Sequence, residues 1–229
     1  PESFSPGDIP AHAVDLRNGA DLFHAGACAS CHRLPESSEE GPYLLGGGNE
    51  IHTDFGVFRV PNISPDPNTG IGTWNEVDFA NAMLLGVAPG GSHYYPAFPY
   101  TSYSRMTMAD VLDLKAFLDT LPAVDQAVGG HDLSFPWNVR RGIGLWKTRY
   151  LDASPVVPID ETDPVLVRGR YLVEGPAHCA ECHTPRDFAV GMQSSRWIPG
   201  SQNHDSEGRV PKITPHGDGL CEWYLPDLA

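Results

Sequence analysis

The feature that most constrains this chain is a five-residue pattern that occurs twice. It reads Cys-Ala-Ser-Cys-His at residues 28–32 and Cys-Ala-Glu-Cys-His at residues 179–183. Two cysteines separated by two residues and followed at once by histidine are the attachment signature of c-type haem. The thiols add to the vinyl groups on one porphyrin edge, and the histidine then lies under the ring and reaches the iron. The predicted haem-binding residues are Cys28, Cys31 and His32 in the first motif and Cys179, Cys182 and His183 in the second.

Two other kinds of site use a Cys-x-x-Cys pair. A zinc site requires a second cysteine or histidine pair at matching spacing, and neither half of the chain supplies one. A thioredoxin-like redox pair does not need the histidine and would not need it twice. The sequence therefore predicts two covalently bound c-type haems, with His32 and His183 as iron ligands.

The composition suits small domains that fold around a cofactor. Only 41% of the residues are hydrophobic, and 22 prolines and 24 glycines among 229 residues predict loops and short helices. A porphyrin adds the apolar volume that such a domain lacks. The net charge of −14 leaves no basic patch for phosphates, so nucleic acid is not an expected partner. An acidic surface instead suits docking to a basic patch on a redox partner protein.

The sequence also bears on location. No apolar run approaches the ~18 residues of a membrane-spanning helix. Haem attachment is normally completed outside the cytoplasm, so we expect a periplasmic chain whose signal peptide has been removed. Residues 135–150 carry a local basic strip with two interpretations. It is either a partner or membrane-surface contact, or a connector that packs across both halves with its cations in solvent. The second is favoured. The cations are Arg140, Arg141, Lys147 and Arg149.

The chain divides into two units. The first unit is residues 1–122, the connector is 123–160, and the second unit is 161–229. Apolar spacing predicts three helices in the first unit, with loops between them. The first helix has an apolar stripe of Val14, Leu16, Leu22 and Phe23. The predicted helices cover residues 13–25, 74–85 and 107–121, and the loops cover 33–72 and 86–106.

The second unit repeats the first. Residues 60–65, Val-Pro-Asn-Ile-Ser-Pro, return as 210–215, Val-Pro-Lys-Ile-Thr-Pro. Residues 70–74 return as 219–223 without a gap. The second unit offers no counterpart of the loop and helix that follow in the first, so we expect it to lack its C-terminal part.

Three residues give more local predictions. Gly19 lies where a close helix crossing needs a missing side chain. Thr107 with Asp110 predicts a capping box at the start of the third helix. Cys221 is the one cysteine outside the two motifs, and we expect it to be a buried small apolar residue.

The sixth iron ligand bears directly on function. A methionine thioether raises the potential and closes the site to small molecules, whereas an open position permits catalysis. For the first haem the candidates are Met106, Met108, His93 and Met83. Met106 is favoured because it comes directly before the cap Thr107 and can point back to the iron. The alternative for Met106 is a hydrophobic staple preceding the helix.

The sixth ligand of the second haem stays unassigned. The chain offers Met192, His178, His204 and His216, none of them at the position used in the first unit. We expect this ligand to come from outside the sequence or from a partner chain.

Together these residues resemble the class I dihaem cytochromes c related to the cytochrome subunits of bacterial alcohol and gluconate dehydrogenases. The resemblance covers nearly the whole chain and rests on the paired motifs, on 60–65 with 70–74, and on 95–103, Tyr-Pro-Ala-Phe-Pro-Tyr-Thr-Ser-Tyr. It implies a mostly α-helical fold of two tandem class I cytochrome c domains, with long loops around covalently bound haem. Many relatives carry a ligand methionine where this chain has Phe98, which gives that role to Met106 or leaves the iron five-coordinate. Relatives of the dehydrogenase type usually carry three haems.

The resemblance implies a periplasmic dihaem cytochrome that carries electrons between a dehydrogenase or small donor and a respiratory or photosynthetic acceptor. Its partners would be a dehydrogenase subunit, an oxidase or another cytochrome. The alternative is a haem enzyme with one open iron, peroxidase-like or thiosulfate-oxidising. Arg186 and Asp187 would then be its cationic and acid/base groups, or else bind a propionate. A third interpretation is a structural haem subunit that docks through residues 135–150.

Overall fold

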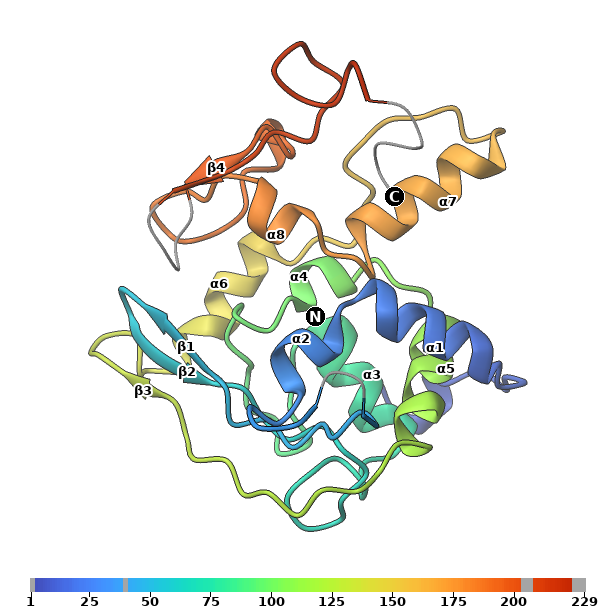
Figure 1. Cartoon of the computed structure of the whole chain (residues 1–229), viewed down its shortest axis with the longest axis vertical. Helices are drawn as coiled ribbons and strands as arrows, with labels where there is room; N and C mark the ends of the chain where they lie inside the picture. The colour runs from blue at the N-terminus through green and yellow to red at the C-terminus, as the bar shows by residue number, and fades with distance from the viewer. Residues whose placement is uncertain (1–2, 39–40, 203–207, 224–229) are drawn as a thin grey trace.

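The computed structural model describes residues 3–38, 41–202 and 208–223. It consists mainly of short helices with two small sheets, so the mostly helical prediction is confirmed. In Figure 1 the first unit fills the lower half of the view and the second unit, in orange and red, the upper half. Within these described ranges, no helix has both the length and the apolar character needed to cross a membrane.

The first unit contains the three predicted helices and several shorter elements. The predicted helices begin one to three residues late, at Leu16, Glu76 and Met108, because Asp15, Asn75 and Thr107 cap them with their side chains. In chain order the elements are η1 (Pro6–Asp8), α1 (Leu16–Ala25), α2 (Cys28–His32), β1 (Glu50–Thr53), β2 (Gly56–Arg59), α3 (Glu76–Leu85), α4 (Tyr100–Tyr103) and α5 (Met108–Asp119).

Helices α1 and α5 cross closely, as Gly19 predicts. A Cβ atom at Gly19 would lie 2.2 Å from the carbonyl oxygen of Asp113. The buried Asp113 carboxylate of α5 also joins the two helices, because it accepts a hydrogen bond from the amide of Asp15, the N-cap of α1, at 2.8 Å. The predicted stripe is half wrong: Leu22 and Phe23 are buried, but Val14 and Leu16 are about half exposed at 49% and 48%. Val14 lies before α1 and Leu16 is its first residue, on either side of the cap Asp15.

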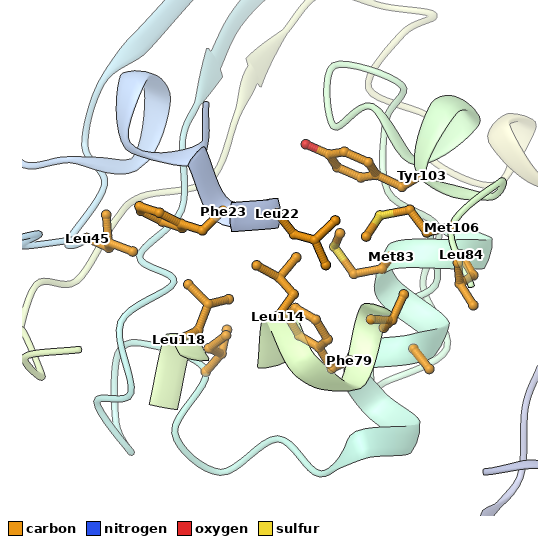
Figure 2. Close-up of a cluster of buried hydrophobic side chains, with 13 residues drawn as sticks. Leu22, Phe23, Leu45, Phe79, Met83, Leu84, Tyr103, Met106, Leu114 and Leu118 are labelled. Carbon is orange, nitrogen blue, oxygen red and sulfur yellow. The ribbon is translucent and has the colours of Figure 1, made fainter. Parts of the chain in front are cut away.

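The core of the first unit is a cluster of 13 buried side chains, shown in Figure 2. They come from α1, α3, α4, α5, the turn between α4 and α5, and the loops at Leu45 and Ile71. Cys28 and Ala29 of α2 pack against this cluster from its edge. The members are Leu22, Phe23, Leu45, Ile71, Phe79, Ala80, Met83, Leu84, Tyr103, Met106, Val111, Leu114 and Leu118.

Residues 33–72 are not one continuous loop, and that prediction is wrong. β1 and β2 form an antiparallel hairpin with Ile51 opposite Phe58. A third strand, β3 (Asp132–Leu133) from the connector, extends the sheet in the order β1-β2-β3. At Gly56 the backbone has φ +124°, and a Cβ atom would lie 2.2 Å from the Asp132 oxygen, so the hairpin turn requires glycine. The missed signal was the β-branched and aromatic residues Ile51, Val57 and Phe58 on either side of a short turn that ends in Gly56.

The connector packs across both units through α6 (Gly142–Tyr150). Trp146 donates its indole Nε1–H to the Ala189 carbonyl in the second unit, at 2.8 Å. On the other side, Lys147 donates its ammonium to the carbonyls of Leu85 and Gly86 at the end of α3, at 2.7 and 2.6 Å. Lys147 therefore satisfies helix-end acceptors. It is only 2% exposed, so the prediction of solvated cations is wrong at this residue. Burial lowers the pKa of Lys147 to about 8.

The second unit has fewer buried apolar side chains among its described residues. Phe188 is 98% exposed and Val165 76% exposed. Cys221 is also exposed, so its predicted burial is wrong: the turn at 219–223 lies at the surface. The elements are α7 (Pro164–Glu174), α8 (Ala180–His183), η2 (Ser194–Arg196), β4 (Ser201–Gln202) and β5 (Arg209–Val210), with β4 and β5 antiparallel.

Candidate haem sites

The two Cys-x-x-Cys-His motifs have the same backbone shape. Each lies on a short helix, α2 or α8, that begins after a residue in the left-handed conformation, Ala27 at φ 47° and His178 at φ 40°. This conformation is unfavourable for a residue with a side chain, so its presence at both positions marks a constrained entry to the motif. No disulfide joins cysteines within the described residues. Burial raises the pKa of Cys28 to about 12 and also raises that of Cys179.

The two motif histidines are oriented by matching hydrogen bonds. His32 Nδ1 lies 2.8 Å from the carbonyl oxygen of Pro61, and His183 Nδ1 lies 2.8 Å from that of Pro211. A carbonyl only accepts, so Nδ1 carries the proton and Nε2 presents its lone pair. Burial lowers the pKa of His32 against the opposing effect of the Pro61 bond. Each ring is therefore held in the tautomer that binds a metal through Nε2.

The turns that surround each motif repeat as well. In each unit the amide of a later glycine donates to the carbonyl of the motif histidine. In each unit a backbone hydrogen bond of 2.9 Å also closes the turn after the repeated Pro-containing segment. The sequence repeat is therefore a structural repeat. The paired bonds are Gly47 N to His32 O (2.8 Å) with Gly200 N to His183 O (2.9 Å), and Ile71 N to Ser64 O with Leu220 N to Thr214 O (both 2.9 Å).

Met106 and the first motif share one apolar body. Met106 is 6% exposed and belongs to the cluster against which Cys28 packs. In Figure 2 the side chains of Met106 and Met83 point toward each other and toward Leu22. A thiol pair at the edge of an apolar cluster, a metal-binding histidine tautomer and a buried thioether make up the donor set that c-type haem requires. The residues of the first unit therefore fit this group.

The other candidates for the first haem lie in different settings. Met108 is half-buried in the first turn of α5. Met83 shares the buried cluster with Met106 but lies within α3 rather than on the turn before α5. His93 belongs to the contact with the connector, where its Nδ1 lies 3.1 Å from Lys147 Nζ. Phe98 packs on the cluster with its ring 5.7 Å from that of Tyr103, so it fills apolar space.

The cap before α5 is only partly as predicted. The Thr107 hydroxyl accepts from the Asp110 amide at 3.1 Å, which confirms the N-cap. The Asp110 carboxylate does not complete a capping box. It accepts instead from Asn18 Nδ2 at 2.6 Å and from the Tyr171 hydroxyl of the second unit. The sequence reasoning missed this contact because Tyr171 is remote along the chain.

The candidates for the second haem are not gathered in a buried cluster like that around Met106. His178 Nε2 lies 3.1 Å from the Gly26 carbonyl, at the contact between the units. His216 is exposed and pairs with Asp218 at 2.7 Å. Met192 is half-buried in a small loop bridged to Arg186. His204 lies outside the described residues. The second ligand therefore stays unassigned.

Arg186 and Asp187 both have structural partners. Arg186 donates to the Glu181 carboxylate at 2.6 Å, and Asp187 accepts from the Tyr150 hydroxyl at 2.7 Å. Trp197 is different, because its buried Nε1–H has no hydrogen-bond partner among the described residues. It lies close in sequence to the Ile198 amide, which donates to Thr184 beside the second motif at 3.0 Å. An unpaired buried donor at this place fits a haem carboxylate.

A zinc site finds no support in the donor set. Across the described ranges, no three His, Cys, Asp or Glu side chains come together in a group that could hold a metal ion. A protein-bound zinc ion needs at least three such ligands. The motif cysteines and histidines therefore suit a porphyrin, which itself supplies four of the donors to its iron.

Comparison with known proteins agrees with this donor set. The cytochrome c family model matches residues 16–122. A protein of Cereibacter sphaeroides named "Diheme cytochrome c-type" is 49% identical over 215 residues, which is 94% of this chain and 71% of the relative. The cytochrome c subunit of alcohol dehydrogenase (quinone) from Gluconacetobacter polyoxogenes is 38% identical, over 95% of this chain and 44% of the relative. The gluconate 2-dehydrogenase cytochrome c subunit of Pantoea cypripedii is 37% identical, over 96% and 51%.

The chain belongs to the cytochrome c family, whose members bind haem and transfer electrons. The predicted resemblance to dihaem cytochromes and to dehydrogenase cytochrome subunits is confirmed. The chain spans about half the length of these two dehydrogenase subunits.

Proposed function

We propose that this protein is a periplasmic dihaem cytochrome that carries single electrons between a dehydrogenase or small donor and a respiratory or photosynthetic acceptor. The bound haem iron supplies this chemistry by changing between its ferrous and ferric states. One haem is attached by Cys28 and Cys31 and ligated by His32 and Met106. The other is attached by Cys179 and Cys182 and ligated by His183.

The observation that carries this proposal is the matched pair of histidine bonds to Pro61 and Pro211, both 2.8 Å long. Two remote parts of the chain hold an imidazole next to a thiol pair in one tautomer. A structural cysteine pair has no use for that tautomer, whereas an axial ligand requires it. Two haems follow from two such sites.

Met106 is the proposed sixth ligand of the first haem because it is a buried thioether in the cluster against which Cys28 packs and lies on the turn directly before α5, whereas Met83, the other thioether of the cluster, lies within α3. A thioether favours the ferrous state and so raises the potential. The first iron would then be closed to small molecules, as an electron carrier needs.

The redox partner is proposed from the charge of the chain and from the names of its relatives. The net charge of −14 favours docking to a basic surface, with faster encounter at low salt. Several relatives are named as dehydrogenase cytochrome subunits, so a dehydrogenase is the favoured donor.

The second candidate function, a haem enzyme with an open iron in the second unit, rests on the unassigned ligand there. It needs polar groups free to act on a substrate. Arg186 and Asp187, the candidates for that role, are held by Glu181 and Tyr150. Electron transfer is therefore the better supported function.

The test is carbon monoxide binding to the anaerobically reduced protein. We expect the intact mass to show two haems and the Soret band of the first haem to be insensitive to the gas. Met106→Ala should make that haem reactive, whereas Met108→Ala, the matched control two residues away, should not. A chain with fewer than two haems, or a Met106→Ala variant that behaves as wild type, would overturn the proposal.

A further inference from the structure

The segment that carries Met106 lies against the second unit. Residues 101–107 include the last part of α4, the turn and the cap of α5. Met106 is joined to this turn by its amide, which donates to the Tyr103 carbonyl at 2.8 Å. Its own side chain points into the core of the first unit. Residues before and after Met106 in the sequence are held by hydrogen bonds to the second unit or the connector.

On the N-terminal side the partner is Glu181, which lies inside the second motif between Cys179 and Cys182. Its Oε1 accepts from the hydroxyls of Thr101 at 2.7 Å and Ser102 at 2.8 Å. Both hydroxyl residues are buried, and the Glu181 side chain is only 9% exposed. Bonds to a buried carboxylate are stronger than bonds between neutral groups. The second motif is therefore hydrogen-bonded directly to α4.

Arg186 forms an ion pair with the same Glu181 carboxylate. Its guanidinium donates to the other carboxylate oxygen of Glu181 at 2.6 Å and to the Glu181 carbonyl at 3.2 Å. The buried carboxylate is thereby paired as well as hydrogen-bonded. A satisfied buried network of this kind fixes one geometry, because each broken bond leaves a desolvated polar group.

On the C-terminal side the partner is Tyr171 of α7. Its hydroxyl accepts from the Thr107 amide at 3.2 Å and donates to the Asp110 carboxylate. Arg105, the residue before Met106, donates through Nε to the Ser154 carbonyl of the connector at 3.0 Å. Residues 105 and 107 are therefore both held from outside the first unit, and Met106 lies between them.

We propose that the second unit positions the iron ligand of the first, with Glu181 and Tyr171 as positioning residues. This inference rests on the proposed function, since it takes Met106 as the ligand. Glu181 and Tyr171 keep the turn at one distance from the first motif and so keep the thioether on the iron. The first haem's ligation then depends on residues that belong to the second haem's unit.

The test uses Glu181→Ala and Tyr171→Phe in the haem-loaded chain. The readouts are the weak red absorption band of methionine-ligated ferric haem, the reduction potential of the first haem, and carbon monoxide binding to the ferrous protein. Met106→Ala identifies the signals of the first haem. In both variants we expect a weaker band, a lower first potential, and gas binding to the first haem that rises by about tenfold, the change that losing one charge-assisted hydrogen bond produces.

The chain offers a matched control for each variant. Glu161 is also a carboxylate paired with an arginine, but its partner is Arg170 of the same unit, at 2.6 Å. Tyr150 also loses a hydroxyl bond when changed to phenylalanine, but that bond goes to Asp187, away from residues 101–107. Glu161→Ala and Tyr150→Phe should leave all three readouts of the first haem unchanged.

The outcomes separate the inference from the function on which it rests. Unchanged readouts in Glu181→Ala and Tyr171→Phe, with two haems and a responsive Met106→Ala, would overturn the inference alone. A wild-type chain with one haem, or an unresponsive Met106→Ala, would overturn the proposed function and the inference together. Glu181→Gln, which keeps an acceptor for Thr101 or Ser102, should lie between wild type and Glu181→Ala. If Glu181→Ala does not fold, Tyr171→Phe and Ser102→Ala decide by the same readouts.

Discussion

The two units present the same motif geometry in different surroundings. His32 and His183 make equal bonds to proline carbonyls, and the residues before Cys28 and Cys179 share a left-handed backbone. Around the first motif lies a cluster of 13 buried apolar side chains. The described residues of the second unit instead include large apolar side chains that are well exposed, such as Phe188 at 98%.

This difference separates two requirements of a haem site. Attachment and the histidine ligand depend on a few consecutive residues and one nearby turn, and both units carry these residues in the same geometry. A sixth ligand depends on a side chain brought from far along the chain to the apolar side of the motif. In the first unit the core buries Met106, the proposed ligand, in the cluster against which Cys28 packs, and contacts from the second unit hold its flanks.

The largest expected difference between the units is in the free energy of unfolding that is lost when a leucine is truncated in the helix before each motif. Leu22 and Leu172 each lie three residues after a glycine of the helix, but Leu22 is 2% exposed and Leu172 is half-buried. We expect Leu22→Ala to lower the free energy of unfolding by about 2–5 kcal/mol through loss of apolar contact and a cavity, and Leu172→Ala by about 1 kcal/mol. Guanidinium unfolding followed by circular dichroism measures both. Equal losses would show that the second unit has a comparable core.

The next contrast is at the glycines of the same helices. A Cβ at Gly19 would meet the Asp113 oxygen at 2.2 Å, whereas nothing lies within 4 Å of one at Gly169. Gly19→Ala should cost about 1–3 kcal/mol through overpacking. Gly169→Ala should stabilise by about 0.5–1 kcal/mol, because alanine favours the helix. The same unfolding experiment tests the opposite signs, and a shared sign would contradict the closeness of the α1–α5 crossing.

A smaller effect on the free energy of unfolding is expected at Asp113, and it should depend on pH. Burial alone would raise the pKa of Asp113, but hydrogen bonds from the Asp15 amide, Asn18 and His12 outweigh it, so the pKa lies below its usual value. Its stabilisation is therefore complete above about pH 4 and is lost as the pH falls through the lowered pKa. Asp113→Asn should cost about 1–2 kcal/mol at neutral pH.

Denaturation of wild type and Asp113→Asn from pH 7 to pH 3 checks this dependence, and the gap between them should close toward the acid end. The matched control is Asp163→Asn at the N-cap of α7, since asparagine caps a helix about as well as aspartate. A gap that stays constant with pH would contradict the lowered pKa of Asp113.

The smallest effect is expected at Cys221. Its side chain is exposed, so Cys221→Ala should change the free energy of unfolding by less than about 0.5 kcal/mol. In the haem-loaded protein the other four cysteines would be joined to porphyrin, so a maleimide should label one thiol per chain, and none in Cys221→Ala. Labelling of further thiols would show that one motif has not attached its haem.

Sequence reasoning went furthest where a signal is local. The side-chain N-cap at Thr107, the close crossing at Gly19 and the repeated turns at 60–65 and 210–215 all follow from neighbouring residues, and the structure confirms them. It failed where a remote partner decides. Lys147 is buried because the end of α3 needs donors, and the Asp110 carboxylate is taken by Tyr171. No spacing within the connector or within α5 could indicate either partner.

The sequence by itself determined the class of cofactor, because covalent attachment needs two thiols and a histidine at fixed spacing, and the chain carries that spacing twice. It also determined the orientation of the histidines, through turns that close within about 30 residues of each motif. Only the tertiary structure decided which side chains lie around Met106 and what holds its flanks. Those contacts join residues up to 80 positions apart, and sequence periodicity does not encode contacts at that range.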